Sequence, residues 1–347
     1  MLFSYLYKME KELIQYFKTL PNTGKEELIN SLISHLTNDA EPSSVRDLKN
    51  DQINHSGLSC PHCSGTKIIG FGSYKGVKRY RCKTCHKTFN ALTGSAFHKI
   101  HKKDIMHQYL FFMLQGYPLR KISEEMDICL KTAFDWRHKI LRALMEKPTK
   151  KLNGIIESDE TFFLYSEKGN KKVKGRKPRK RGGAAGKRGI NKDHITVLSA
   201  FERESGNTYN TVVCKGRITK KAIHKGVGRY IDKHNSILCS DSHLSFQNYT
   251  KERDIDHRCI FVRRKEFVVD RIYHIQNINR IHKQLKEWIR RFNGVSTKYL
   301  QNYLNYYRIV FSTQNKTNQT KTAILSILTA NNVYIQRDKI SQQYCIT

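Results

Sequence analysis

Two aspartates and an asparagine, each in a different predicted element, could together bind divalent metal ions. Asp159 lies in an alternating stretch typical of a β-strand, with Glu157 on the same face, and Asp241 ends the short apolar stretch 236–241, which also predicts a strand. Asn279 lies on a later predicted helix. Oxygen atoms from strand ends and a helix can hold a pair of Mg²⁺ ions that act on a phosphodiester. A lone aspartate at a strand end is also a common cap or surface residue.

The helix that carries Asn279 is predicted within the stretch from His274 to Arg308. Its apolar residues recur at spacings of three and four and would share one face: Ile278, Ile281, Leu285, Trp288 and Ile289. Lys286 follows Asn279 by seven residues, or two helical turns, so both lie along one line beside that face, with His282 and Lys283 between them. An ordinary amphipathic helix with a solvated basic face gives the same pattern.

Four of the nine cysteines form two Cys-x-x-Cys pairs, Cys60 with Cys63 and Cys82 with Cys85, separated by eighteen residues. This spacing is typical of a structural zinc site, in which two tight turns present four thiolates to one tetrahedral ion. Two unrelated pairs, or a redox Cys-x-x-Cys, are the alternatives. Four thiolates leave no coordination position for water, so the zinc would not be catalytic.

The charge of the chain indicates a polyanionic partner. Lys and Arg number 63 against 30 Asp and Glu, which gives a net charge of +33 over 347 residues. The most direct partner of this kind is DNA or RNA. The sequence contains no apolar run of the roughly 20 residues that a membrane span needs, and it opens with no leader peptide. We therefore expect a cytoplasmic, nucleoid-associated protein.

Residues 119–144 resemble a helix-turn-helix. In such a pair the early residues of the second helix face the base edges of a major groove, and these would be Lys131, Thr132, Asp135, Trp136 and Arg137. We predict DNA contacts from Lys131 and Arg137 in particular. Plain helices of a bundle are the alternative.

A strongly basic loop is predicted between Lys168 and Lys192, where twelve Lys or Arg residues accompany six glycines and no acid. Such a loop could close on phosphates without reading bases. The predicted DNA contacts of this loop are Arg176, Lys177, Arg179, Lys180 and Arg181.

The order of elements after residue 150 predicts an α/β fold. A strand with Asp159 is followed by a hairpin of residues 194–203 and 207–214, a crossover helix at 219–233 and the strand that ends at Asp241. We divide the chain into a helical N-terminal segment and linker (1–58, with two short helices between residues 4 and 37), a zinc ribbon (59–95), a helix-turn-helix-like segment (96–150), a catalytic domain (151–312) and a C-terminal tail (313–347).

Taken together, the cysteine pairs, the ESDET strand, the KPRKRGG loop, the CSDSH segment and the HIQNINRIHKQLKEWIRRF helix resemble insertion-sequence transposases of the ISXO-like group, in the family numbered fifteen-ninety-five. The resemblance covers Ser59 to about Val310. It implies a ribonuclease-H-like DDE catalytic domain, from the branch whose active site holds Asp-Asp-Asn-Lys, here Asp159, Asp241, Asn279 and Lys286.

The resemblance also implies an activity. The chain would bind double-stranded DNA, namely the terminal inverted repeats and the target DNA, with the zinc ribbon and the helical segment contacting the repeats. It would catalyse metal-dependent strand cleavage and strand transfer, with Mg²⁺ or Mn²⁺ held by Asp159, Asp241 and Asn279 and a phosphate held by Lys286. A homo-oligomer would form on DNA, since two ends must be brought together. A repurposed DNA-binding protein that no longer cuts is the alternative, and a nuclease acting on RNA or RNA–DNA hybrids is a weaker third.

Overall fold

The structure is a computed structural model, and it describes residues 21, 58–74, 77–102, 105–144, 151–170, 172–173 and 182–311. The helices predicted between residues 4 and 37 lie outside these residues, as do the five basic-loop residues from Arg176 to Arg181.

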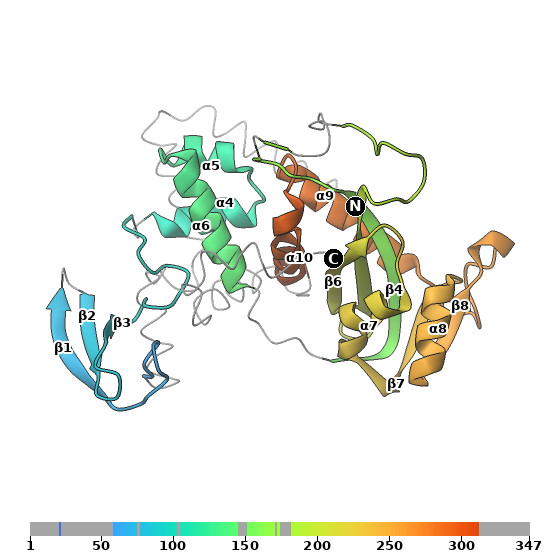
Figure 1. Cartoon of the computed structure of the whole chain (residues 1–347), viewed down its shortest axis with the longest axis horizontal. Helices are drawn as coiled ribbons and strands as arrows, with labels where there is room; N and C mark the ends of the chain where they lie inside the picture. Colours follow the sequence, from blue (N-terminus) through green and yellow to red (C-terminus); the bar gives the residue numbers. More distant parts are fainter. Residues whose placement is uncertain are drawn as a thin grey trace.

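The cysteine-rich segment forms a small antiparallel sheet of three strands, β1 (Ile68–Tyr74), β2 (Val77–Cys82) and β3 (Thr88–Asn90) (Figure 1). Among the described residues, its buried apolar core consists of Cys60, Cys82 and Phe89. So small a core gives little stability by itself, which is why a second source of stability is expected in this segment.

Three helices follow, α4 (Met106–Leu114), α5 (Leu119–Glu125) and α6 (Leu130–Ala143). The last two lie where the sequence predicts a helical pair, and the turn between them contains Asp127 in the left-handed region (φ 46°). Their function as a DNA-reading pair stays a prediction.

A mixed sheet of five strands occupies the second half of the chain, in the order β6-β5-β4-β7-β8. Its strands are β4 (Leu152–Leu164), β5 (His194–Glu202), β6 (Thr208–Lys215), β7 (Ile231–Asp241) and β8 (Asp256–Ile260). The predicted hairpin is confirmed as the antiparallel pair β5–β6, and the predicted parallel pairing after the crossover is confirmed between β4 and β7.

Helices cover both faces of this sheet (Figure 1). On β5, Ile195 and Val197 belong to one apolar core, whereas Leu198 and Ala200 belong to another, because successive side chains of a strand point to opposite faces. The first core includes α9 (Gln276–Arg291) and α10 (Thr297–Phe311), and the second includes α7 (Lys220–Gly226) and α8 (Leu244–Arg253).

The crossover helix is shorter than its predicted range of 219–233. It ends at Gly226, a 3-10 turn follows (η1, Gly228–Tyr230), and β7 already begins at Ile231. A β-carbon on Gly226 would lie 2.7 Å from Val213 Cγ1, and one on Gly228 would lie 2.6 Å from the Tyr249 hydroxyl. Both glycines therefore allow a close approach that ends the helix and turns the chain into the strand.

Helix α9 and the three helices α4 to α6 share one apolar core with α10. The stretch between His274 and Arg308 forms two helices, because Asn293 and Gly294 adopt positive φ values of 56° and 93°. On α10, Gln301 accepts a hydrogen bond from Val212 N (2.8 Å) and donates one to Asn210 O (3.0 Å). These two bonds satisfy part of the exposed edge of β6.

A second 3-10 turn (η2, Val262–Arg264) follows β8. In the described part of the chain, none of the helices has both the length and the apolar character that crossing a membrane requires.

Candidate functional site

Asp159 and Asp241 lie side by side on neighbouring parallel strands. The last residues paired between β4 and β7 are Glu157 and Cys239, and each aspartate follows its strand's paired residue by two positions. Side chains alternate along a strand, so both aspartates face the side of the sheet that α9 covers. Sequence reasoning placed both residues on strands, but only the register shows that they are level with each other.

The two aspartates and Glu160 influence one another through their charges, although Glu160, the next residue on β4, points to the opposite face of the sheet. The pKa of Asp159 is raised to about 8, chiefly by burial and also by the neighbouring carboxylates of Glu160 and Asp241. Burial and the Asp241 carboxylate raise the pKa of Glu160 to about 7. Glu160 was not among the predicted site residues. A second acid directly after Asp159 in the same strand is the sequence signal that could have indicated it.

A divalent cation beside Asp159 and Asp241 fits this arrangement. The raised pKa of Asp159 means that its carboxylate ionises at a cost next to the other acids, and a bound Mg²⁺ would offset that cost with its own charge. The side chain of Asp159 is 18% exposed, so an ion can reach it from solvent.

Helix α9 lies against Asp159 through His282, whose Nδ1 is 3.8 Å from Asp159 Oδ2. Burial and the charge of Lys286 lower the pKa of His282 to about 4, which keeps the imidazole neutral. The charge of Lys286 also acts on Asp159, where it lowers the pKa and so opposes the effect of the acids. Sequence reasoning noted His282 only as a residue between two candidates.

Asn279 precedes His282 by three residues and Lys286 follows it by four, so the three side chains lie on one face of α9. Asn279 and Lys286 are both exposed. The structure therefore brings Asp159 and Asp241 together, and it places Lys286 where its charge acts on Asp159. Asn279 lies one helical turn from His282, the residue of α9 that lies 3.8 Å from Asp159.

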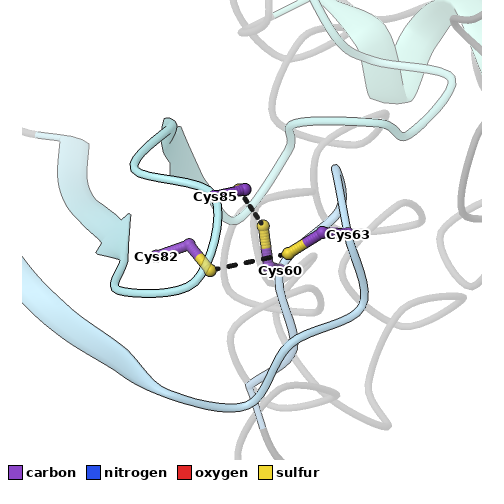
Figure 2. Close-up of side chains that lie close together, drawn as sticks. All are labelled: Cys60, Cys63, Cys82 and Cys85. Carbon is purple, nitrogen blue, oxygen red and sulfur yellow. Dashed lines mark hydrogen bonds between the residues drawn. The ribbon is translucent and has the colours of Figure 1, made fainter.

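The four predicted zinc ligands converge in a second site (Figure 2). Their sulfur atoms all lie within 4.8 Å of one another, and two pairs, Cys60 with Cys85 and Cys63 with Cys82, are 3.6 Å apart. Zinc–sulfur bonds of about 2.3 Å in a tetrahedron would separate the sulfurs by about 3.8 Å. The four cysteines thus fit one zinc ion.

Backbone N–H groups point at this site. His62 N lies 3.4 Å from Cys60 Sγ, and Thr84 N lies 3.3 Å from Cys82 Sγ. The backbone N–H of Cys85, the largest influence, together with that of Thr84 lowers the pKa of the Cys82 thiol to about 6. Such donors stabilise a thiolate, the form that binds metal.

The two predicted DNA contacts on α6 differ in their placement. Lys131 is exposed and forms an ion pair with Asp135 (2.8 Å). Arg137, by contrast, is 1% exposed and donates a hydrogen bond from Nη2 to Tyr117 O (2.6 Å). Its guanidinium lies 5.3 Å from the centre of the Phe292 ring. Because α10 and the residues after α9 cover this face of α6, Arg137 cannot reach a base edge, and the expected contact is corrected.

A cavity of about 460 Å³ lies beyond the carboxyl end of β4 and is lined by residues Tyr165–Asn170, Lys215 and Ser296–Lys298. Lys168 donates to the carbonyl oxygens of Asn293 (2.8 Å) and Gly294 (2.9 Å) at the end of α9. Lys215 and Lys298 place their ammonium groups over the rings of Tyr165 and Tyr299, each at 4.7 Å. Three cations and one acid, Glu167, thus line the cavity.

Comparison with known proteins finds similarity over part of the chain. Residues 151–308 match the model of the ISXO2-like transposase domain. A protein described as an uncharacterized protein in transposable element ISH50, from Halobacterium salinarum, is 32% identical over 120 residues, which cover 34% of this chain and 40% of that protein. The match thus spans less than half the length of this relative.

Two solved structures with low overall similarity also match. The HTLV-2 integrase catalytic core domain in complex with magnesium is 13% identical, with 48% of this chain and 88% of that chain covered and a TM-score of 0.28. The pre-cleavage Mos1 transpososome is 9% identical, with 63% and 77% covered and a TM-score of 0.21.

Proposed function

We propose that this protein is the transposase of an insertion sequence, which binds terminal inverted repeats and then cuts and joins DNA strands, because residues 151–308 match the ISXO2-like transposase domain. This function rests most on the level placement of Asp159 and Asp241 on parallel strands beside α9. The sheet order, with β5 and β6 antiparallel on one side of β4 and β7 and β8 parallel on the other, is what a ribonuclease-H-like DDE domain requires.

Each side chain of the proposed active site would have a distinct role. Asp159 and Asp241 would hold Mg²⁺ or Mn²⁺, and Asn279 would add a neutral oxygen from α9. When bound, a metal pair supplies an activated attacking oxygen and stabilises the leaving oxygen of the phosphodiester. Lys286, whose charge already acts on Asp159, would hold a phosphate of the reacting strand. Neutral His282 would close the protein side of Asp159 to water.

The direct test is incubation of the full chain with duplexes that carry the ends of its element, in Mg²⁺ or Mn²⁺, with cleaved and joined strands resolved on a gel. We expect both products. Binding to the ends without any cleavage in either metal would instead establish the repurposed DNA-binding protein. Cleavage confined to RNA or RNA–DNA hybrids would establish the nuclease. Sedimentation of the DNA complex would show whether a homo-oligomer forms on two ends.

We further propose that the cavity beyond β4 takes phosphates of the DNA that flanks the cut. Tyr165 follows Asp159 by six residues on an extended strand, which is about 20 Å at about 3.3 Å per residue, or roughly six base pairs of DNA. Lys215 and Lys298 line this cavity, and so does Lys168, the residue at which the predicted basic loop begins.

Replacing both Lys215 and Lys298 by glutamate should weaken DNA binding on all sequences alike. Because each phosphate contact contributes about 0.9 to the slope of log K against log salt, the slope should become shallower by about 2. Filter binding or fluorescence anisotropy over a range of salt concentrations measures it. The control, Lys221→Glu with Lys225→Glu, makes the same charge change on α7, on the opposite face of the sheet. Equal slopes in the two double variants would show a general charge effect and remove the cavity from the DNA path.

A further inference from the structure

Helix α9 begins without a cap from its own residues. The residue before its first turn, Ile275, has no side-chain acceptor, and the first turn contains no acid. The first N–H groups of a helix have no partner within the helix, and a buried N–H group without an acceptor is costly. Because Ile278 is fully buried, an acceptor for its N–H must come from elsewhere in the fold.

Glu157 on β4 supplies that acceptor. Its Oε2 accepts a hydrogen bond from Ile278 N (3.0 Å), and its Oε1 accepts one from the side-chain amide of Asn277 (2.7 Å). The carboxylate itself is 0% exposed. A negative charge at a helix N-terminus is also favoured by the helix dipole. Glu157 therefore caps α9 from a strand that lies more than a hundred residues earlier in the chain.

Arg203, just after β5, completes the charge balance of this buried group. Its Nε donates to Glu157 Oε1 (2.7 Å), while Nη1 and Nη2 donate to the carbonyl oxygens of Ile272 (2.7 Å) and His274 (3.1 Å). The ring of His274 accepts from Gln276 N (3.3 Å), which further fixes the entry into α9. A buried ion pair holds a fixed geometry when its remaining donors and acceptors are satisfied, as they are here.

We call Glu157, Arg203 and Asn277 the clamp. It joins the two elements that carry the proposed active site, strand β4 and helix α9. Glu157 lies two residues before Asp159 on the same face of β4. The backbone N–H that it binds belongs to Ile278, the residue before Asn279. We propose that Glu157 is a positioning residue, which sets the placement of Asn279 on α9 relative to Asp159. The inference rests on the proposed function, since it concerns the same metal-binding residues.

Glu157→Gln tests this role with little change of shape. Glutamine keeps one acceptor oxygen but has an NH₂ group in place of the second oxygen of the carboxylate. Either Ile278 N or the two donors Arg203 and Asn277 therefore lose their acceptor. We expect cleavage about 10- to 100-fold slower and Mn²⁺ affinity lower by a similar factor, as for residues that orient metal ligands. Hydrogen exchange of the amides at residues 276–280 should also become faster.

The decisive comparison repeats the change in an Asn279→Ala background. If Glu157 acts through Asn279, Glu157→Gln should cost little further Mn²⁺ affinity once Asn279 is gone. Equal fold-losses in both backgrounds would show that Glu157 only stabilises the fold, and the proposed role would be wrong. Calorimetry with Mn²⁺ alone gives this result even if the parent protein never cuts DNA, so failure of the proposed function is separately visible.

Glu202→Gln is the matched control. Glu202 is a buried carboxylate of the same sheet that accepts from Asn153 N (2.9 Å) and Asn207 Nδ2 (3.0 Å), and it lies opposite Ile156 on the face of the sheet away from α9. It should lower stability without changing Mn²⁺ affinity. If Glu157→Gln fails to fold, Asn277→Ala removes one bond of the clamp and should give a smaller loss of the same kind. An unchanged Mn²⁺ affinity in Asn277→Ala, with the amide exchange of α9 also unchanged, would overturn the clamp.

Discussion

Asp159→Asn is expected to slow DNA strand cleavage at least about a thousandfold while leaving binding to the terminal repeats nearly unchanged. The substitution keeps the shape and one oxygen of the side chain but removes the negative charge that holds a divalent ion. Loss of about 4 kcal/mol of metal-dependent stabilisation of the transition state corresponds to a thousandfold in rate. Single-turnover cleavage of end duplexes, with anisotropy for binding, measures the two quantities.

Two residues of β7 provide the companion and the control. Asp241→Asn should be as severe, because Asp241 lies level with Asp159 on the neighbouring strand. Asp232 lies near the other end of β7, where it accepts a hydrogen bond from Asn235 (3.2 Å), so Asp232→Asn should cleave at the parent rate. Cleavage by Asp159→Asn at more than a tenth of the parent rate would mean that the metal ions sit elsewhere.

The same variant should make the metal-free protein more stable at alkaline pH. The pKa of Asp159 is about 8 in the folded chain, against an ordinary value of 3.8, so between these values the folded state retains a proton that the unfolded state has lost. The stability of the parent therefore falls as pH rises from about 4 to about 8. The amide of the Asp159→Asn variant does not titrate in this range, so the variant's Tm should exceed the parent's most at pH 8.5 and least at pH 5.

Added Mg²⁺ should act in the opposite direction and favour the parent over the Asp159→Asn variant. It should raise the Tm of the parent, whose carboxylates it binds, more than that of the Asp159→Asn variant. Scanning calorimetry at pH 5 and pH 8.5, each with Mg²⁺ or with EDTA, measures the difference in Tm between parent and variant under all four conditions. A parent Tm that is insensitive to both pH and Mg²⁺ would contradict the crowding of acids around Asp159.

The local elements of the catalytic sheet could be predicted from the sequence because their signals are local. Alternation of apolar and polar residues identified the strand of Asp159, and the hairpin followed from a short polar turn between two such stretches. The spacing of three and four also predicted the apolar stripe of α9, and all five of its residues are buried in the structure. Those patterns placed Asp159, Asp241 and Asn279 on the correct elements.

The relations between elements were not contained in such patterns. The level placement of Asp159 with Asp241 depends on the register of a parallel pair, which the alternation of one strand does not set. Arg137 was predicted to contact DNA from its place early in α6, yet the ring of Phe292, from a distant part of the chain, lies against its guanidinium and only 1% of the residue is exposed. The clamp of Glu157 joins three segments, and nothing near Glu157 in the sequence indicates its partners.

Cys82→Ser is expected to unfold the cysteine-rich segment and to reduce bound zinc from about one per chain to a small fraction. The described part of the segment buries only three side chains in its own core, one of which is Cys82 itself. A structural zinc site contributes about 10–16 kcal/mol of apparent binding free energy in small zinc-finger peptides, and loss of one thiolate removes most of it. DNA affinity should fall with the fold, since we predict that the ribbon binds the terminal repeats.

Hydrogen exchange separates this local effect from general damage. Amides of β1 and β2, which pair from Ile68 with Cys82 to Tyr74 with Val77, should exchange fast in Cys82→Ser. Those of β4 and β5 should stay protected, because their cores contain no residue of β1, β2 or β3. Cys129→Ser changes an exposed cysteine outside the cluster and should keep both zinc and protection. EDTA treatment of the parent should reproduce the Cys82→Ser exchange pattern. Protection of β1 and β2 that survives complete removal of metal would show that the ribbon folds without zinc, and the structural role would be wrong.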